Sequence, residues 1–333
     1  MEKRTLAGSG VRPVGLGCMN LSHGYSAFPT PQEGARLLRH ALDAGVDHLD
    51  TATLYGQGRN EELIGAAIAG RRREYFLASK CGLEMVDGRG RVDGRPHVLR
   101  RQAEASLRRL RTSRIDLYYL HRLDRRVPIE ESVGALAEMV RDGMIGAIGL
   151  SEVSAATLRR AHAVHPIAAV QTEYSLWTRN PELGILRACR ELGTAFVAFS
   201  PLARAYLTGT LTDPSALPGN DMRRHMPRFN AENYPRNLAL LEGFTAVAAR
   251  LGTTPAALAV AWVLAQGEHV VAIPGTTRAD HLEENLAAER LQLDAATLAE
   301  LDGLINQRTV HGHRYSSLQR ATIDTEDFPG AEA

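Results

Sequence analysis

Short apolar runs alternate with longer amphipathic stretches along almost the whole chain. The runs have the length and residue content of buried strands, and the stretches between them repeat apolar positions at helical spacing. The expected strands are 11–19, 47–52, 75–80, 115–121, 144–151, 168–173, 195–202 and 270–275. The expected helices are 30–44, 58–69, 96–111, 130–142, 154–164, 180–193, 236–251, 255–266, 279–288 and 294–306.

This alternation makes eight strand–helix units with no change of composition that would mark a linker. Strands joined by helices of ten or more residues pair in parallel through right-handed crossovers. Eight units favour a closed (β/α)₈ TIM barrel over an open doubly wound sheet. The glycines of Gly15-Leu16-Gly17 lie inside a strand pattern, and no third glycine follows at the spacing of a Rossmann fingerprint. We therefore expect an α/β fold with one barrel domain over 1–306 and a C-terminal tail over 307–333.

Two long stretches interrupt the alternation, 83–96 after the third strand and 203–235 after the seventh. Long loops at the active rim of a barrel usually shape substrate access or cover a ligand, although ordinary mobile insertions are the alternative. The tail from Gln307 is polar and loses helical periodicity. We expect it either to fold over the rim or to be disordered.

Composition narrows the class of protein. The net charge of +1 argues against a nucleic-acid partner. Cys18, Cys81 and Cys189 are odd in number, lie in or beside apolar runs and lack metal-ligand spacing, which fits a reducing compartment. The N-terminus lacks the apolar stretch of a signal peptide, and no apolar run approaches the roughly 20 residues of a membrane span. We expect a soluble cytoplasmic protein without a metal site.

The candidate chemistry lies at the ends of three consecutive strands. Asp50, Lys80 and His121 each fall near a strand end, and Tyr55 follows just after the first of these strands. Parallel strands would bring these residues to one rim, where αβ barrels carry their active sites. The lysine is notable because almost all of the 39 basic residues are arginine. Lysine is compact, and its pKa responds to burial, whereas a guanidinium stays charged.

Together these four residues would polarise and protonate a carbonyl while another group delivers hydride. A lysine ammonium would lower the pKa of a nearby tyrosine from about 10, and an aspartate would keep the lysine charged. A histidine opposite would orient the carbonyl oxygen or relay a proton. Each residue alone has an ordinary alternative: Asp50 as a helix cap, Tyr55 as a packed aromatic and His121 as a core histidine.

The segment Asp50-Thr51-Ala52-Thr53-Leu54-Tyr55-Gly56, with Lys80 and His121, resembles the signature of the aldo-keto reductases. The resemblance runs from about Arg4 to Leu304 and is closest to a bacterial and fungal branch with pyridoxal reductase-like enzymes. The segments that match this branch are 15–19, 149–154, 171–177 and 273–278.

The resemblance implies an extended nicotinamide cofactor across the rim. Ser151 and Gln171 would hold the carboxamide, and Tyr174 would stack on the nicotinamide ring. The remaining contacts implied are Ser200, Pro201, Leu202 and Leu207 along the pyrophosphate, Gly275, Thr276, Thr277 and Arg278 at the adenosine phosphate, and His281, Glu284 and Asn285 about the adenine. Because Arg278 can pair with a 2′-phosphate, NADP(H) is favoured over NAD(H). The chain departs from its relatives at Glu152, where many have asparagine, at Ala203 and Ala205, where glycine is common, and at Tyr206, where phenylalanine is common.

The expected function is NADPH-dependent reduction of an aldehyde or ketone, with Tyr55 as general acid and a small-molecule carbonyl compound as substrate. One alternative is a cofactor-binding regulatory subunit with little turnover; another is a Schiff-base lyase that uses Lys80. Tyr25, Phe28, Trp177, the loop 83–96 and the tail are candidates for the pocket wall. The substrate and the oligomeric state stay open at this stage.

Overall fold

The computed structural model describes residues 2–25, 27–86 and 89–329. Eight parallel strands form one sheet in the order β12-β11-β10-β9-β8-β5-β4-β3. Parallel bridges from Val14 to Ala272 and from Gly17 to Gly275 join the first strand to the last and close the barrel. The strands are β3 (Leu16–Gly17), β4 (His48–Asp50), β5 (Phe76–Cys81), β8 (Leu117–Leu120), β9 (Ile148–Ser151), β10 (Ile167–Glu173), β11 (Ala195–Phe199) and β12 (Val270–Ile273). The expected (β/α)₈ barrel is confirmed.

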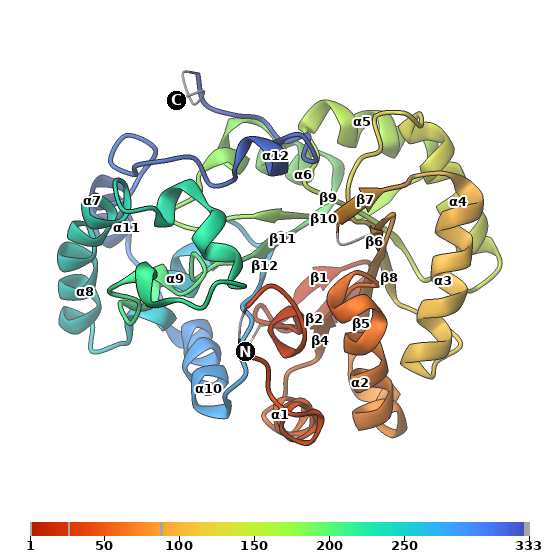
Figure 1. The fold of residues 1–333 in the computed structure, drawn as a ribbon, viewed down its shortest axis with the longest axis horizontal. Helices are drawn as coiled ribbons and strands as arrows, with labels where there is room; N and C mark the ends of the chain where they lie inside the picture. Colours follow the sequence, from red (N-terminus) through yellow and green to blue (C-terminus); the bar gives the residue numbers. More distant parts are fainter. Residues whose placement is uncertain (1, 26, 87–88, 330–333) are drawn as a thin grey trace.

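Helices surround the strands on the outside (Figure 1). They are α1 (Pro31–Asp43), α2 (Arg59–Ile68), α3 (Pro96–Leu110), α4 (Ile129–Arg141), α5 (Ala155–Val164), α6 (Ile185–Leu192), α7 (Tyr234–Ala239), α8 (Leu241–Arg250), α9 (Pro255–Leu264), α10 (Ala279–Ala287) and α11 (Ala295–Leu304). The first begins at a capping box, in which the Thr30 hydroxyl accepts from the Glu33 N–H and the Glu33 carboxylate accepts from the Thr30 N–H.

Apolar side chains pack in two layers. One layer lies between the strands and the helices, and α9 is buried within it from Ala256 to Leu264. The other fills the inside of the barrel. An antiparallel hairpin of β1 (Arg4–Leu6) and β2 (Ser9–Val11) contributes Leu6 and Val11 to this inner layer.

Several expected elements differ in extent. The strand expected over 11–19 is only two residues long in β3; Val11 belongs to β2, and Val14 joins the last strand through an isolated bridge. The helix expected over 180–193 is divided at Gly184 into a 3₁₀ turn and α6. The helix expected over 236–251 is divided into α7 and α8.

The long loops and the tail contain structure of their own. The loop after β5 holds an antiparallel hairpin of β6 (Leu83–Val86) and β7 (Arg89–Val92), whose turn lies outside the described residues. The tail includes the short helix α12 (Ser317–Arg320) and crosses the barrel near α5 and α6 (Figure 1). Of the two expectations for the tail, the described part fulfils the first, since it folds over the rim.

Within the described ranges, no single helix has both the length and the apolar character needed to cross a membrane. The stretches Tyr234–Arg250 and Pro255–Leu264 meet that test only as a pair, and they are bent by 88° at the break between them. Nor does any group of three or more His, Cys, Asp or Glu side chains in these ranges have the arrangement of a metal site.

Candidate active site

Lys80 is the centre of a buried hydrogen-bond cluster at the carboxyl ends of β4 and β5. Its ammonium donates to the Asp50 carboxylate, to the Thr51 carbonyl oxygen at 2.9 Å and to the Tyr55 hydroxyl at 3.3 Å. The Gln171 amide donates to the other Asp50 oxygen at 2.7 Å. These contacts use all three ammonium protons and fix the lysine beneath the tyrosine. The structure therefore brings the sequence-predicted Asp50, Tyr55 and Lys80 together.

The charge state of this cluster follows from burial and its partners. Burial lowers the pKa of Lys80, but Asp50 and Tyr55 together outweigh that effect, and the pKa is raised above its ordinary value. Burial raises the pKa of Tyr55, and Lys80 opposes this without reversing it. The expected effect of Lys80 on the pKa of the tyrosine is present, but burial outweighs it. At neutral pH the site holds an ammonium and an intact phenol.

His121 lies beside the phenol as a neutral imidazole. The ring centroids of Tyr55 and His121 are 6.0 Å apart in an edge-to-face arrangement, and His23 stacks on Tyr55 with a centroid distance of 5.6 Å. Burial lowers the pKa of His121 well below 6.5, and the charges of Arg122 and Lys80 lower it further. The ring can hydrogen-bond to a carbonyl oxygen without carrying charge.

A cavity of about 1020 Å³ extends from Tyr55 and His121 to α10. Most of the residues expected to hold a cofactor line it. These are Ser151, Gln171, Ser200, Pro201, Leu202, Gly275, Thr276, Thr277, His281, Glu284 and Asn285.

Three of the expected cofactor residues do not line this cavity. The Tyr174 ring packs against Phe196 and Trp262 in the outer layer, and its hydroxyl donates to Glu182 at 2.8 Å. Leu207 is fully buried in the same layer. These two side chains are on the helix side of the strands, which corrects the expected contacts with the nicotinamide and the pyrophosphate.

The third expected cofactor residue, Arg278, is exposed, and its guanidinium makes two hydrogen bonds to the Asp280 carboxylate.

Two residues expected in the substrate pocket also lie outside this cavity. Trp177 stacks on Tyr206 and lines a second, smaller cavity, and Phe28 is 46% exposed.

Phe199 and Arg122 are among the cavity-wall residues that the sequence analysis did not predict. Phe199 ends β11 and lines the cavity directly before Ser200, and Arg122 lines it directly after His121. The sequence contained a signal for both residues. Each lies at or just beyond the carboxyl end of a barrel strand, as Asp50 does.

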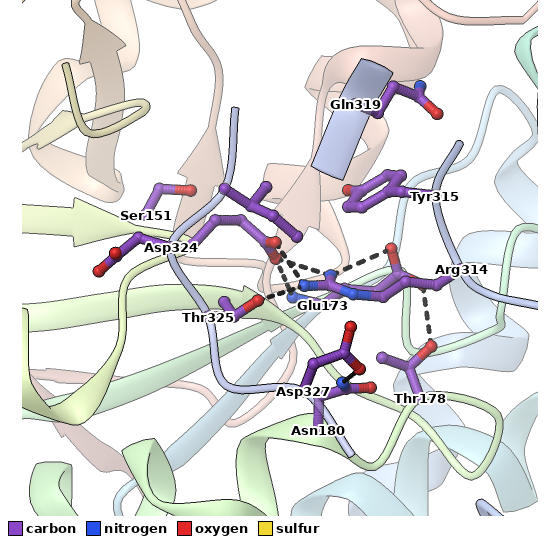
Figure 2. Close-up of polar contacts among 12 residues, drawn as sticks. Ser151, Glu173, Thr178, Asn180, Arg314, Tyr315, Gln319, Asp324, Thr325 and Asp327 are labelled. Atoms are coloured by element: carbon purple, nitrogen blue, oxygen red, sulfur yellow. Dashed lines mark hydrogen bonds and ion pairs between the residues drawn. The ribbon is translucent and has the colours of Figure 1, made fainter. Parts of the chain in front are cut away.

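The tail is held to the barrel by buried ion pairs. The Arg314 guanidinium donates to both oxygens of Glu152, at 3.1 and 2.7 Å, and to the Thr325 hydroxyl at 2.8 Å. It also lies 3.8 Å from Glu173 (Figure 2). Glu173 in turn pairs with Arg204. The acid at position 152 therefore pairs with the tail. Residues of the tail then line the cavity, namely Tyr315, Leu318, Gln319, Thr322 and Ile323.

Comparison with known proteins decides the family. The model of the aldo/keto reductase family matches residues 13–306, most of the chain. The chain belongs to the aldo/keto reductase family. An oxidoreductase is thereby supported, while the pyridoxal reductase-like branch stays a prediction.

Solved structures of bacterial members of this family share the fold. A glycerol dehydrogenase from Gluconobacter oxydans is 30% identical, with a TM-score of 0.84 over 91% of this chain and 94% of that one. An aldo-keto reductase from Bacillus halodurans, solved in a holo form, is 27% identical, with a TM-score of 0.77 over 92% and 97%. An aldo/keto reductase from Klebsiella pneumoniae, solved in complex with NADP and acetate, is 27% identical, with a TM-score of 0.72 over 95% and 99%.

Proposed function

We propose that the protein reduces an aldehyde or ketone to an alcohol with NADPH as the hydride donor. The observation that carries this proposal is the hydrogen-bonded series Asp50–Lys80–Tyr55 beside a neutral His121. This series lies at one end of a cavity that continues to α10. Hydride reduction of a carbonyl requires a proton donor and a site for the hydride-donating cofactor, and we assign these two parts to the cluster and to the cavity beside it.

The polar groups of the cavity fit a dinucleotide. The Asn285 amide is buried at the far end, and its nitrogen has no acceptor among the described residues. Because a buried donor is costly when unpaired, an adenine ring nitrogen is a suitable partner. At the near end, Ser151 and Gln171 would hold the carboxamide. Phe199 replaces Tyr174 as the aromatic side chain for the nicotinamide.

NADP(H) is the cofactor we propose, in agreement with the NADP complex of the Klebsiella pneumoniae relative. Thr276 and Thr277 line the cavity before α10, at a helix N-terminus, where a phosphate is favoured. To pair with a 2′-phosphate, Arg278 would exchange its partner Asp280 for the ligand.

Bound NADPH supplies the hydride that reduces the carbonyl carbon. The Tyr55 hydroxyl donates its proton to the carbonyl oxygen. The Lys80 ammonium then stabilises the phenolate that remains, and Asp50 keeps Lys80 charged and in place. His121 donates a hydrogen bond that orients the oxygen toward the phenol.

The contacts of Lys80 argue against a Schiff-base lyase. A nucleophilic lysine needs an unprotonated amine with access to substrate. Lys80 is 1% exposed, its three protons are all engaged, and its pKa is raised. The Lys80 amine therefore has neither the free lone pair nor the access to substrate that a nucleophile needs.

Tyr55→Phe tests the proton-donor role. We expect turnover to fall by a factor on the order of 10² or more, while NADPH binding changes little, because only the transferable proton is lost. NADPH oxidation with a panel of aldehydes and ketones measures turnover, and cofactor fluorescence measures binding.

Tyr75→Phe is the matched control, because the buried Tyr75 hydroxyl has no partner among the described residues. This variant should keep near-normal turnover. Near-normal turnover of Tyr55→Phe would remove Tyr55 from the acid role. A wild-type protein that binds NADPH but reduces none of the panel would favour the regulatory alternative.

A further inference from the structure

Arg122 presents a cation to the cavity next to the proposed proton donor. One of its terminal nitrogens donates to the His121 carbonyl oxygen at 2.7 Å and to the Ser151 hydroxyl at 3.3 Å. Within residues 2–25, 27–86 and 89–329, no carboxylate lies within the 4.0 Å of an ion pair with this guanidinium. Its other N–H groups have no acceptor in these ranges, and the side chain lines the cavity.

Two other arginines near this cavity are matched by acids. Arg204 pairs with Glu173 at 2.8 Å, and Arg314 pairs with Glu152 at 2.7 Å. A half-buried charge without such a counter-charge is costly, and a ligand anion would offset that cost. Arg122 thus differs from its neighbours in having donors left for a ligand.

The net charge around Tyr55 and His121 also favours an anionic ligand. Lys80 is balanced by Asp50, so Arg122 adds a net positive charge. Arg122 directly follows His121, is bonded to Ser151 and lines the same cavity as Tyr55, so its charge lies at the reacting end of the cavity. An anionic group on the substrate would meet this charge within a short distance of the reacting carbon.

We propose that Arg122 binds a carboxylate or phosphate group of the substrate, so that the preferred substrates are small anionic aldehydes or ketones. This proposal rests on the proposed carbonyl reduction. The planar fork of a guanidinium matches both anions, and the bond to the His121 carbonyl fixes that fork relative to the imidazole. Arg122 is therefore a specificity-determining residue.

The tail strengthens such an ion pair by limiting access of water. Arg125, on the same loop as Arg122, donates to the Ile323 carbonyl oxygen at 3.1 Å. This contact holds the tail against the loop, and Gln319 and Thr322 line the cavity from there. Exclusion of water lowers the local dielectric constant and makes a charge pair stronger.

Arg122→Gln tests the proposal with matched pairs of substrates. The carboxylate pair is 4-carboxybenzaldehyde and its neutral methyl ester; the phosphate pair is glycolaldehyde phosphate and glycolaldehyde. We expect the variant to lose about 10- to 100-fold in kcat/KM for the anionic member of at least one pair, and little for its neutral member. Arg122→Lys should recover part of the preference because it retains the charge.

Arg141→Gln is the control for net charge, since Arg141 lies on the outer helix α4 with its side chain 75% exposed. It should leave the preference unchanged. Equal losses for anionic and neutral substrates in Arg122→Gln would mean that Arg122 only positions His121 and would overturn the proposal. Weaker NADPH binding without a change of preference would assign the guanidinium to the cofactor and overturn it too.

A binding measurement separates this proposal from the proposed function. Calorimetric titration of benzoate and of inorganic phosphate into the NADP⁺-loaded protein should show binding of at least one of them that Arg122→Gln weakens by about 10-fold or more. If the wild type reduces no carbonyl at all, the proposed function fails, and this titration still decides whether Arg122 binds an anion. Affinities equal in both proteins would contradict the anion site.

Discussion

In the loop that directly follows β11, four residues other than glycine adopt positive φ angles: Ser200, Ala203, Arg204 and Ala205. For residues with a Cβ this region costs on the order of 1 kcal/mol or more. Ala205, at φ 75°, is only partly buried, so its methyl group adds little packing. We expect Ala205→Gly to raise the free energy of unfolding by about 1 kcal/mol, measured by urea denaturation.

The same substitution in a helix provides the control. Ala299 is exposed in the middle of α11, where glycine is unfavourable. Ala299→Gly should lower the free energy of unfolding by about 1 kcal/mol. Changes of the same sign in the two variants would mean that relief of backbone strain does not control the stability change at position 205.

For individual residues, the sequence predicts the location of those that lie at the ends of strands. Asp50, Lys80 and His121 belong to this group, because parallel strands place their carboxyl ends at one rim. Tyr174 follows the end of β10, where the alternation of side chains no longer applies, so the direction of its ring could not be predicted. The pairing of Arg314 with Glu152 joins residues far apart in the chain, and no local pattern encodes it.

The attachment of the C-terminal tail to the barrel depends on one buried arginine, Arg314. Arg314→Met would leave Glu152 buried without its main counter-charge. We expect the tail to detach from the barrel, because the remaining carboxylate favours hydration. Limited proteolysis should then cleave after residue 306 much faster than in the wild type, and KM for carbonyl substrates should rise as the cavity loses a wall.

Arg308→Met is the matched control in the same segment. Arg308 is exposed and forms no ion pair with the described residues. Its replacement should leave both the cleavage rate and KM near the wild-type values. Equal protease resistance of Arg314→Met and wild type would show that other contacts, such as those of Asp324 with Ser154 and Thr157, suffice to hold the tail.

Helices could be predicted from the sequence where a capping motif marks their first turn. Thr30 and Glu33 mark the start of the helix expected over 30–44, and the structure has a capping box there. The tail contains a second such signal, Ser316 with Gln319, which marks the start of α12. The hairpin of β6 and β7 also has a local signal, because Leu83-Glu84-Met85 alternates and the pair Asp87-Gly88 favours a hairpin turn, although the sequence analysis assigned the whole stretch to a loop.

For the whole molecule, the number of strand–helix units predicts the closed barrel. Closure of the barrel depends on close backbone contacts, which the spacing of apolar residues along the sequence does not reveal. A Cβ on Gly17 would lie 2.7 Å from the Ile273 carbonyl oxygen, so the first and last strands meet only because this residue is glycine. The sequence therefore predicts the type of barrel, while the close backbone contact at Gly17 becomes visible only in the structure.

The pH dependence of stability should depend on a histidine buried in the barrel wall. His48 is fully buried without hydrogen-bond partners for its ring among the described residues. Burial lowers its pKa to about 4. As the pH falls from 6.5 toward 4, the unfolded chain binds a proton that the folded chain does not, so stability decreases; below 4 both states bind it. Between pH 7 and pH 5 this linkage removes about 2 kcal/mol.

His48→Leu should remove that part of the pH dependence, because no group at position 48 then titrates in either state. Urea denaturation at pH 7 and pH 5 measures the difference for each protein. His97→Leu, at an exposed position, should keep the wild-type difference. If wild type and His48→Leu lose equal stability between the two pH values, acid sensitivity comes from other groups. His121, whose pKa is also lowered by burial, would be the next histidine to replace.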